Sequence, residues 1–150
     1  MKMELCDILK ADSIFLDVNV RTRTEVFDYF SRILLDLQFI DHEKEFRDGL
    51  LAREEQISTA IGYKIAVPHI QAACIRAPVI CFLRNEKGIL WEDRENSFVK
   101  MVFLIAVPQE MEGEHLNLLA HLSRKLMHQR IRKALMNMHA KEEIFQILGS

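Results

Sequence analysis

Three residues of this chain have side chains and local settings suited to anion or phosphoryl chemistry, namely Arg53, His69 and His115. His69 follows the apolar stretch of residues 65–68, whose final proline removes a backbone donor and pushes Val67 towards extended geometry. We therefore expect a short strand to stop there and to present His69 at its exit. An imidazole in that place is either a purely structural residue at the tip of the strand or a nucleophile active near neutral pH.

His115 falls in the first turn of a helix expected over Gly113–His128. It shares an i, i+4, i+7, i+11 stripe with Leu119, Leu122 and Leu126, which predicts a core-facing imidazole. The free N–H groups and the positive dipole of a first turn attract anions. On the local sequence alone, a satisfied histidine at the edge of the core is the favoured interpretation.

Arg53 lies just before the loop that leads to the His69 strand. Its guanidinium fork matches phosphate geometry, although an ordinary helix-end cation would look the same in sequence. Two imidazoles, a helix N-terminus and an arginine together describe a small anion pocket suited to phosphate. One imidazole would be the nucleophile and the other would stabilise the charged group. The chain has no Walker-type loop and no GxGxxG, so the sequence does not support nucleotide binding.

The other four histidines do not predict a metal site. His121 and His128 share a helical face, but nothing completes a ligand set, and HExxH spacing is absent. We expect His121 at the boundary of the core, and we expect solvated imidazoles at His42, His128 and His139. The three cysteines form no CxxC motif, and their odd number favours reduced thiols in the cytosol.

Length and composition fit one cytoplasmic globular domain over residues 1–150, with 49% hydrophobic and 28% charged residues. A formal net charge of −2 argues against a nucleic-acid partner. No apolar run approaches the roughly 20 residues of a membrane span, and the first residues lack the apolar core of a signal peptide. We therefore expect no direct membrane insertion.

Helix-period and strand-like segments are expected to position the three residues. The helices are expected from Thr24 to Leu37 with Thr22 or Thr24 as cap, from Asp41 to near Arg53, and over Gly113–His128, Gln129–Met138 and Ala140–Leu148. The strands are expected at Ser13–Val18, Pro78–Leu83 and Phe98–Val107. The last two runs lack alternation, which indicates strands covered on both faces. The predicted fold is a three-layer α/β/α sandwich with a central mixed sheet, of unknown strand order.

Two sequence blocks resemble the enzyme IIA domains of the fructose–mannitol class, from the bacterial phosphoenolpyruvate-dependent sugar phosphotransferase system. The first block, residues 53–69, reads REEQISTAIGYKIAVPH. The second combines the strand FLIAVP of residues 103–108 with EHLNLL of residues 114–119. Trp91 after Ile89-Leu90 is also typical, and the resemblance extends over essentially the whole chain.

The resemblance implies that His69 accepts a phosphoryl group from the histidine-containing phosphocarrier protein. His69 then passes the group to a cysteine of a cognate enzyme IIB domain, met in trans. His115 and Arg53 are implied to steady the phosphoryl group, with no metal and no bound cofactor. His115 should be neutral or weakly basic, so that it donates a hydrogen bond without burying a charge. The sugar is not implied, because this component does not touch it.

Two alternatives to a transport relay stay open. The family has a nitrogen-related regulatory branch, in which the phosphorylation state would control binding to other proteins. A purely structural α/β domain would make the two histidines coincidental.

Four residues depart from the family pattern. Many relatives have glycine at the positions of Ala60 and Lys64, and a small residue followed by a cation at those of Ile70 and Gln71. Ile70 is bulky and β-branched, so either the local backbone or the docking surface should differ. We expect these changes to affect partner docking more than phosphorylation.

Overall fold

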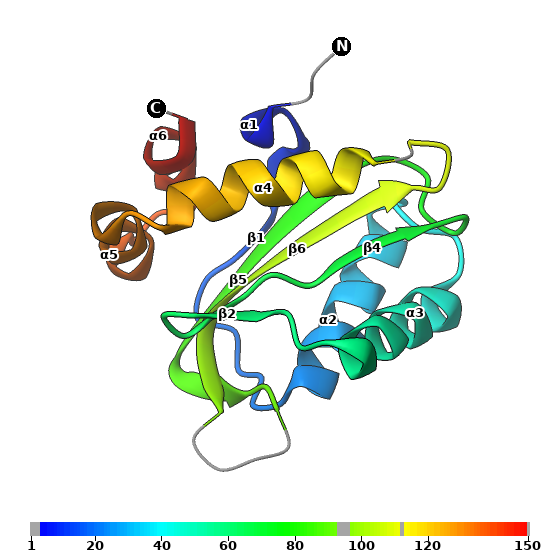
Figure 1. The fold of residues 1–150 in the computed structure, drawn as a ribbon, viewed down its shortest axis with the longest axis horizontal. Coiled ribbons are helices and arrows are strands. Elements are labelled where there is room, and N and C mark those ends of the chain that lie inside the picture. The colour runs from blue at the N-terminus through cyan, green and yellow to red at the C-terminus, as the bar shows by residue number, and fades with distance from the viewer. Residues whose placement is uncertain (1–3, 93–96, 112, 150) are drawn as a thin grey trace.

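The computed structural model describes residues 4–92, 97–111 and 113–149 (Figure 1). The helices are α1 (Leu5–Ile8), α2 (Arg23–Asp36), α3 (Glu43–Gln56), α4 (Glu114–Leu126), α5 (Gln129–Asn137) and α6 (Glu143–Gly149). The strands are β1 (Leu9–Phe15), β2 (Ala60–Gly62), β3 (Ile65–Ala66), β4 (His69–Ala72), β5 (Val79–Leu90) and β6 (Phe98–Pro108).

The strands form one mixed sheet in the order β1-β5-β6-β3-β2, with β4 also paired to β6. The long central pair β5–β6 is antiparallel, whereas β1 runs parallel to β5, and β3 and β4 run parallel to β6. The prediction of a mixed sheet is therefore confirmed.

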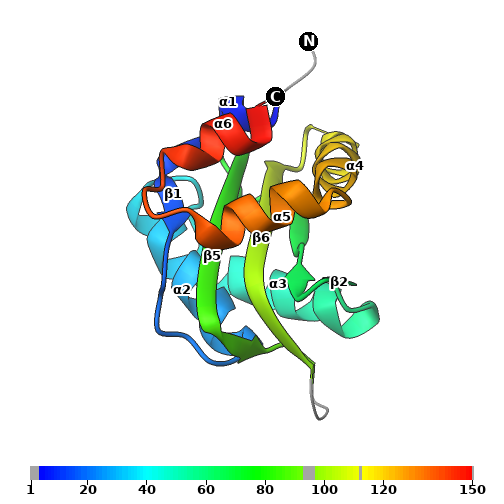
Figure 2. The ribbon, with the colours of Figure 1, turned by 90° about the vertical axis from the view of Figure 1, so that its left-hand side faces the viewer.

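Helices cover both faces of this sheet, which confirms the three-layer prediction (Figures 1 and 2). Side chains of β5 and β6 alternate between two cores, so both runs read as continuously apolar in sequence. Cys81 and Leu104 point to the core under α2 and α3. Phe82 and Phe103 point to the core under the other four helices, with ring centroids 4.8 Å apart.

The start of α2 and the end of α3 differ in how well the sequence predicts them. Thr22 caps α2, because its Oγ1 accepts a hydrogen bond from the Glu25 N–H at 3.2 Å while the Glu25 carboxylate accepts one from the Thr22 N–H at 3.0 Å. Helix α3 ends at Gln56, three residues beyond the predicted end near Arg53. Arg53 therefore lies within the last turn of α3.

Several boundaries near the ends of strands were wrong. Strand β1 runs from Leu9 to Phe15 rather than from Ser13 to Val18, because the chain turns at Asp17, which has a φ of 59°. The short helix α1 was not predicted. Strand β5 continues past Leu83 to Leu90, through a polar stretch that reads as a loop. The strand continues because it stays paired with β6 up to Leu90. The side chain of Arg84 is buried at this point, where its Nη1 donates to the carbonyl oxygens of α5's last turn and of Met138.

The strand before His69 is interrupted rather than ended. Strand β3 stops at Ala66, as the proline predicts, but β4 begins at His69 and pairs with the same neighbour, β6. Pro68 lacks a donor, yet its carbonyl still accepts a hydrogen bond from the Ile105 N–H at 3.0 Å. His69 is thus held in register opposite Ile105, not left at a free strand exit.

Candidate active site

The backbone around His69 fixes which ring nitrogen is free. Its Nδ1 lies 3.0 Å from the Val67 carbonyl oxygen. A carbonyl can only accept, so Nδ1 carries the proton and Nε2 keeps the lone pair. The guanidinium of Arg53 agrees with this tautomer, because its Nη2 can only donate and lies 3.3 Å from Nε2. The ring nitrogen of His69 that keeps its lone pair is therefore Nε2.

Arg53 bridges the end of α3 and the histidine. Its Nη1 donates to the Ile57 carbonyl oxygen at 3.0 Å, while Nη2 faces His69. Among the described residues no carboxylate forms an ion pair with Arg53. The guanidinium is thus oriented by a neutral carbonyl, and its full charge remains available to an anion.

His115 faces His69 from the second residue of α4. The two rings stack with centroids 6.0 Å apart and an interplanar angle of 28°. The pKa of His115 lies below its ordinary value, mainly because the ring is buried and to a lesser extent because His69 and Arg53 are near. This direction agrees with the neutral imidazole expected from the sequence. Its Nδ1 is buried without a hydrogen-bond partner among the described residues.

The start of α4 adds a positive dipole end to the same place. The helix has no side-chain cap, and its N-cap Gly113 has a φ of 81°, which favours glycine. Of the predicted core stripe of His115, Leu122 and Leu126 are buried and Leu119 is half-buried, while the neighbouring Leu118 is buried as well. His115 itself is half-buried, which leaves its ring in contact with both the core and the cavity.

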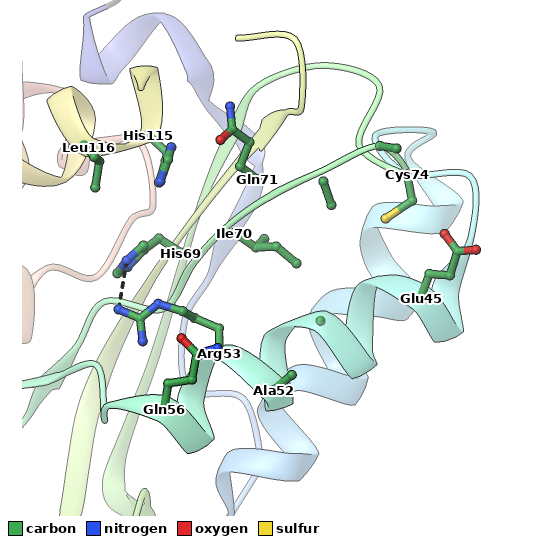
Figure 3. A pocket seen from close by; sticks show the side chains of 13 residues that line it. Glu45, Ala52, Arg53, Gln56, His69, Ile70, Gln71, Cys74, His115 and Leu116 are labelled. Atoms are coloured by element: carbon green, nitrogen blue, oxygen red, sulfur yellow. Dashed lines mark hydrogen bonds between the residues drawn. The ribbon is translucent and has the colours of Figure 1, made fainter. Parts of the chain in front are cut away.

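The three residues line one open cavity of about 560 Å³ between the end of α3, β4 and the start of α4 (Figure 3). The structure therefore brings together all three residues singled out from the sequence. The remaining lining residues are Glu45, Gly49, Ala52, Gln56, Ile70, Gln71, Ala72, Ala73, Cys74 and Leu116.

Sequence reasoning missed a buried carboxylate next to Arg53. Glu54 is 4% exposed and accepts hydrogen bonds from the Thr59 N–H at 2.7 Å and the Trp91 Nε1–H at 3.1 Å. The Thr59 hydroxyl donates to its other oxygen. Glu54 thus fixes the turn after α3, on which Arg53 is anchored through Ile57. An acidic residue beside an arginine is a weak signal, and nothing in one sequence pairs it with Trp91.

The departures at Ile70 and Gln71 are accommodated inside the molecule. Ile70 is 8% exposed and its side chain turns towards α3 (Figure 3), where a Cβ at Gly49 would lie 2.8 Å from Ile70 Cδ1. The absence of a side chain at Gly49 therefore makes room for Ile70, on an ordinary extended backbone. The amide of Gln71 donates to the carbonyl oxygen of Gln109 at 3.2 Å, tying β4 to the turn before α4.

The departures at Ala60 and Lys64 lie in the β2–β3 hairpin. Ala60 pairs with Ala66 within the hairpin. Lys64 is exposed and has a φ of 61°, a conformation that glycine adopts more easily.

The other histidines lie where the sequence predicted. His121 is half-buried, and exposed imidazoles are found at His42, His128 and His139. Within the described ranges, no group of three His, Cys, Asp or Glu side chains is close enough to hold a metal ion. The three cysteines are free. No helix in the described part of the chain is long and apolar enough to cross a membrane.

Comparison with known proteins places this geometry in a family. Over 147 residues the chain is 30% identical to the fructose-specific EIIABC component of the phosphotransferase system of Bacillus subtilis, covering 98% of this chain and 23% of that protein. The crystal structure of the nitrogen regulatory protein IIA-Ntr from Neisseria meningitidis superposes with a TM-score of 0.84, at 28% identity, over 95% of this chain and 97% of that one. The fold also matches a complex of enzyme IIA and phosphorylated enzyme IIB for mannitol from Escherichia coli, with a TM-score of 0.80 and 22% identity over 95% of this chain and 99% of that one.

A family model described as "Phosphoenolpyruvate-dependent sugar phosphotransferase system, EIIA 2" matches residues 7–150. The resemblance seen in the two sequence blocks is thereby confirmed, including its fructose-type and nitrogen-regulatory members. The chain belongs to this EIIA family of phosphotransferase components.

Proposed function

We propose that residues 1–150 act as one EIIA domain that relays a phosphoryl group through His69. The observation that carries the proposal is the unprotonated Nε2 of His69, which lines the cavity with the Nη2 of Arg53 at 3.3 Å and the ring of His115 stacked nearby. A charge-rich transition state for phosphoryl transfer needs mainly positioning and cationic donors, which is what this cavity offers.

The donor in this proposal is a phosphohistidine of the histidine-containing phosphocarrier protein. The Nε2 lone pair of His69 forms the new N–P bond, and the donor's P–N bond breaks with its electron pair returning to the donor ring. The His69 ring becomes cationic, and its Nδ1–H donates to the Val67 carbonyl, which disperses the charge. Arg53 then turns its Nη2–H from Nε2 to a phosphoryl oxygen.

The acceptor is a cysteine thiolate of an enzyme IIB domain, which attacks phosphorus as His69 Nε2 leaves with its electron pair. The match to a fold solved in complex with phosphorylated enzyme IIB supports this partner. Leu116, 55% exposed on the rim of the cavity, offers an apolar contact for a partner. Both partners are expected in the cytoplasm, in contacts brief enough to allow separation.

The test is phosphorylation in vitro with phosphoenolpyruvate, enzyme I and the phosphocarrier protein. The expected product carries one acid-labile, base-stable phosphate, and the His69→Ala variant takes up none. Stoichiometric labelling of His69→Ala would exclude His69 as the acceptor. The His115→Ala variant is expected to accept phosphate but to transfer it poorly, and unchanged onward transfer would reduce His115 to a core residue.

A second candidate is a regulatory role in which phosphorylation of His69 controls binding to another protein. The specific observation in its favour is the similarity to the nitrogen regulatory protein over nearly the whole chain. The two roles differ in the fate of the phosphate. A relay transfers it to an enzyme IIB cysteine within seconds, whereas a regulator keeps it and changes the set of proteins captured by the phosphorylated and unphosphorylated forms.

A further inference from the structure

A second cavity, of about 400 Å³, lies away from His69 between the β2–β3 turn, the start of β6 and α5. It shares no lining residue with the His69 cavity. Figure 1 shows α5 and the tip of the β2–β3 hairpin on the same side of the molecule. Its lining residues are Tyr63, Lys64, Lys100, Met101, Gln129, Arg132, Lys133, Met136 and Asn137.

The lining has four cations and no carboxylate. None of Lys64, Lys100, Arg132 and Lys133 forms an ion pair with another described residue. This concentration of positive charge occurs in a chain whose formal net charge is −2, so it is a local feature and not a property of the whole surface. Clustered, uncompensated cations in a concave site attract anions, and phosphate is the group that lysine and arginine bind best there.

A flat, oriented surface adjoins these cations. The Arg132 guanidinium carbon lies 3.7 Å from the centroid of the Tyr63 ring, and Arg132 Nη1 donates to the Leu126 carbonyl oxygen at 2.7 Å. The pair is therefore fixed in place, although Tyr63 is 63% exposed. An exposed tyrosine with one guanidinium partner leaves ring surface on which a planar group can stack.

The backbone under this surface adopts a costly conformation. Tyr63 and Lys64 have φ angles of 55° and 61°, in a turn that usually carries asparagine and glycine. Left-handed backbone at residues with side chains is typical of functional segments, and here the turn places both side chains at the cavity.

We propose that this cavity binds a small organic phosphate. The phosphate group lies among the lysines, and a planar body stacks on the Tyr63–Arg132 pair above the apolar Met101 and Met136. The volume is in the usual range for small-molecule sites. Recognition by side chains needs no glycine-rich loop, so the lack of a Walker-type loop and of GxGxxG in the sequence does not exclude this site. The site is separate from the phosphoryl relay and does not depend on it.

The probe for this site is adenosine monophosphate, titrated into the ¹⁵N-labelled protein and followed by amide chemical shifts. The expected result is saturable movement of the Tyr63, Lys64 and Lys133 signals, with a Kd below about 1 mM. Lys133→Glu should weaken binding about ten-fold or more, because a charged hydrogen bond is replaced by repulsion. Lys10→Glu makes the same change of net charge at an exposed position of β1 and should leave the Kd unaltered.

Three results would overturn the proposal. The first is the absence of saturable shifts at millimolar adenosine monophosphate, and the second is an unaltered Kd in Lys133→Glu. The third is movement confined to the His69 cavity and abolished by His69→Ala. Pyrophosphate and adenosine test the two parts of the site separately. If pyrophosphate bound as tightly as adenosine monophosphate, stacking on Tyr63 would contribute nothing to binding. If adenosine bound as tightly, the lysines would contribute nothing. The dispersion of the amide spectrum shows in each variant that the fold is retained.

Discussion

Arg53 Nη2 lies 3.3 Å from His69 Nε2 and so occupies the lone pair that a phosphoryl group would take. The same guanidinium is held by the Ile57 carbonyl through Nη1. In the proposed relay, the arginine keeps His69 in one tautomer before transfer and lies one short movement from the phosphoryl oxygens after it. Holding the tautomer and contacting the phosphoryl oxygens both need two N–H donors in a fixed geometry, which the ammonium of a lysine does not supply.

The first prediction concerns Arg53→Lys, which keeps the charge but loses the fork. We expect the second-order rate of phosphoryl acceptance to fall about a hundred-fold, as for the loss of one oriented donor. Rapid-quench measurement with the phosphorylated carrier protein tests this. The control is Arg47→Lys on the same helix, whose guanidinium pairs with Asp28 at 3.5 Å, and which should retain the normal rate. Equal rates in both variants would show that charge alone suffices at Arg53.

The second prediction concerns the pH dependence of His115. Burial and the neighbouring His69 and Arg53 lower its pKa, so the folded protein binds this proton less readily than the unfolded chain does. The free energy of unfolding should therefore fall as pH drops below about 6.5, and this decline should end below the folded pKa of His115. Chemical denaturation at several pH values, compared with His115→Gln, isolates the contribution.

The same pKa should respond to its charged neighbours. Arg53→Gln removes one cause of the lowering, so the His115 pKa should rise, although not to its ordinary value because burial is the largest cause. Phosphorylation of His69 should raise it further, since a nearby anion favours the charged imidazole. Imidazole NMR titration measures both shifts, and a His115 pKa that stays constant in both cases would contradict this electrostatic account.

Much of the site could be predicted because its residues are marked by local chemistry. Pro68 fixes the strand break before His69, and the EHL block places His115 at a helix start, each within a few residues of sequence. Contacts between segments far apart in the chain leave no comparable pattern in the sequence. The bonds from Glu54 to Trp91 and from Arg84 to the end of α5 join residues 37 and 51 apart, and each buries a group that composition alone assigns to the surface.

The resumption of the strand at His69 was missed for a related reason. A proline ends hydrogen bonding in its own segment, and that effect is visible in sequence. Whether the chain rejoins the sheet depends on the neighbour, and β6 extends far enough to pair with both β3 and β4. Strand order and partner length are properties of the assembled sheet, so no single segment predicts them.

The third prediction concerns Glu54→Gln. The neutral amide can keep its oxygen towards the Thr59 N–H and the Trp91 Nε1–H and donate to the Thr59 hydroxyl, but these buried hydrogen bonds lose the carboxylate charge, as does the contact with Arg23 Nη1 at 4.0 Å. We expect the free energy of unfolding to fall by about 1–3 kcal/mol. Urea unfolding followed by Trp91 fluorescence measures this loss. The adjacent Glu55→Gln, at an exposed position of the same helix, is the matched control and should change stability little. A similar loss in both variants would contradict the role of the buried carboxylate.

The last prediction tests the packing of Ile70 over Gly49. Glycine within a helix costs about 1 kcal/mol relative to alanine, so Gly49→Ala should stabilise α3 if its Cβ had room. That Cβ would lie 2.8 Å from Ile70 Cδ1, so Ile70 must shift and part of the gain is lost. Ile70→Val removes Cδ1, and in that background Gly49→Ala should give its full gain.

A double-mutant cycle of these two substitutions, measured by urea unfolding, should therefore give a positive coupling of about 0.5 kcal/mol or more, beyond the additivity of independent sites. Additive effects would show that Ile70 moves aside freely. Ala52→Gly at an exposed position of α3 is the control for helix propensity, and it should cost about 1 kcal/mol in both backgrounds. The coupling would establish that a bulky residue next to the phosphoryl acceptor is accommodated by the helix that carries Arg53, rather than by the docking surface.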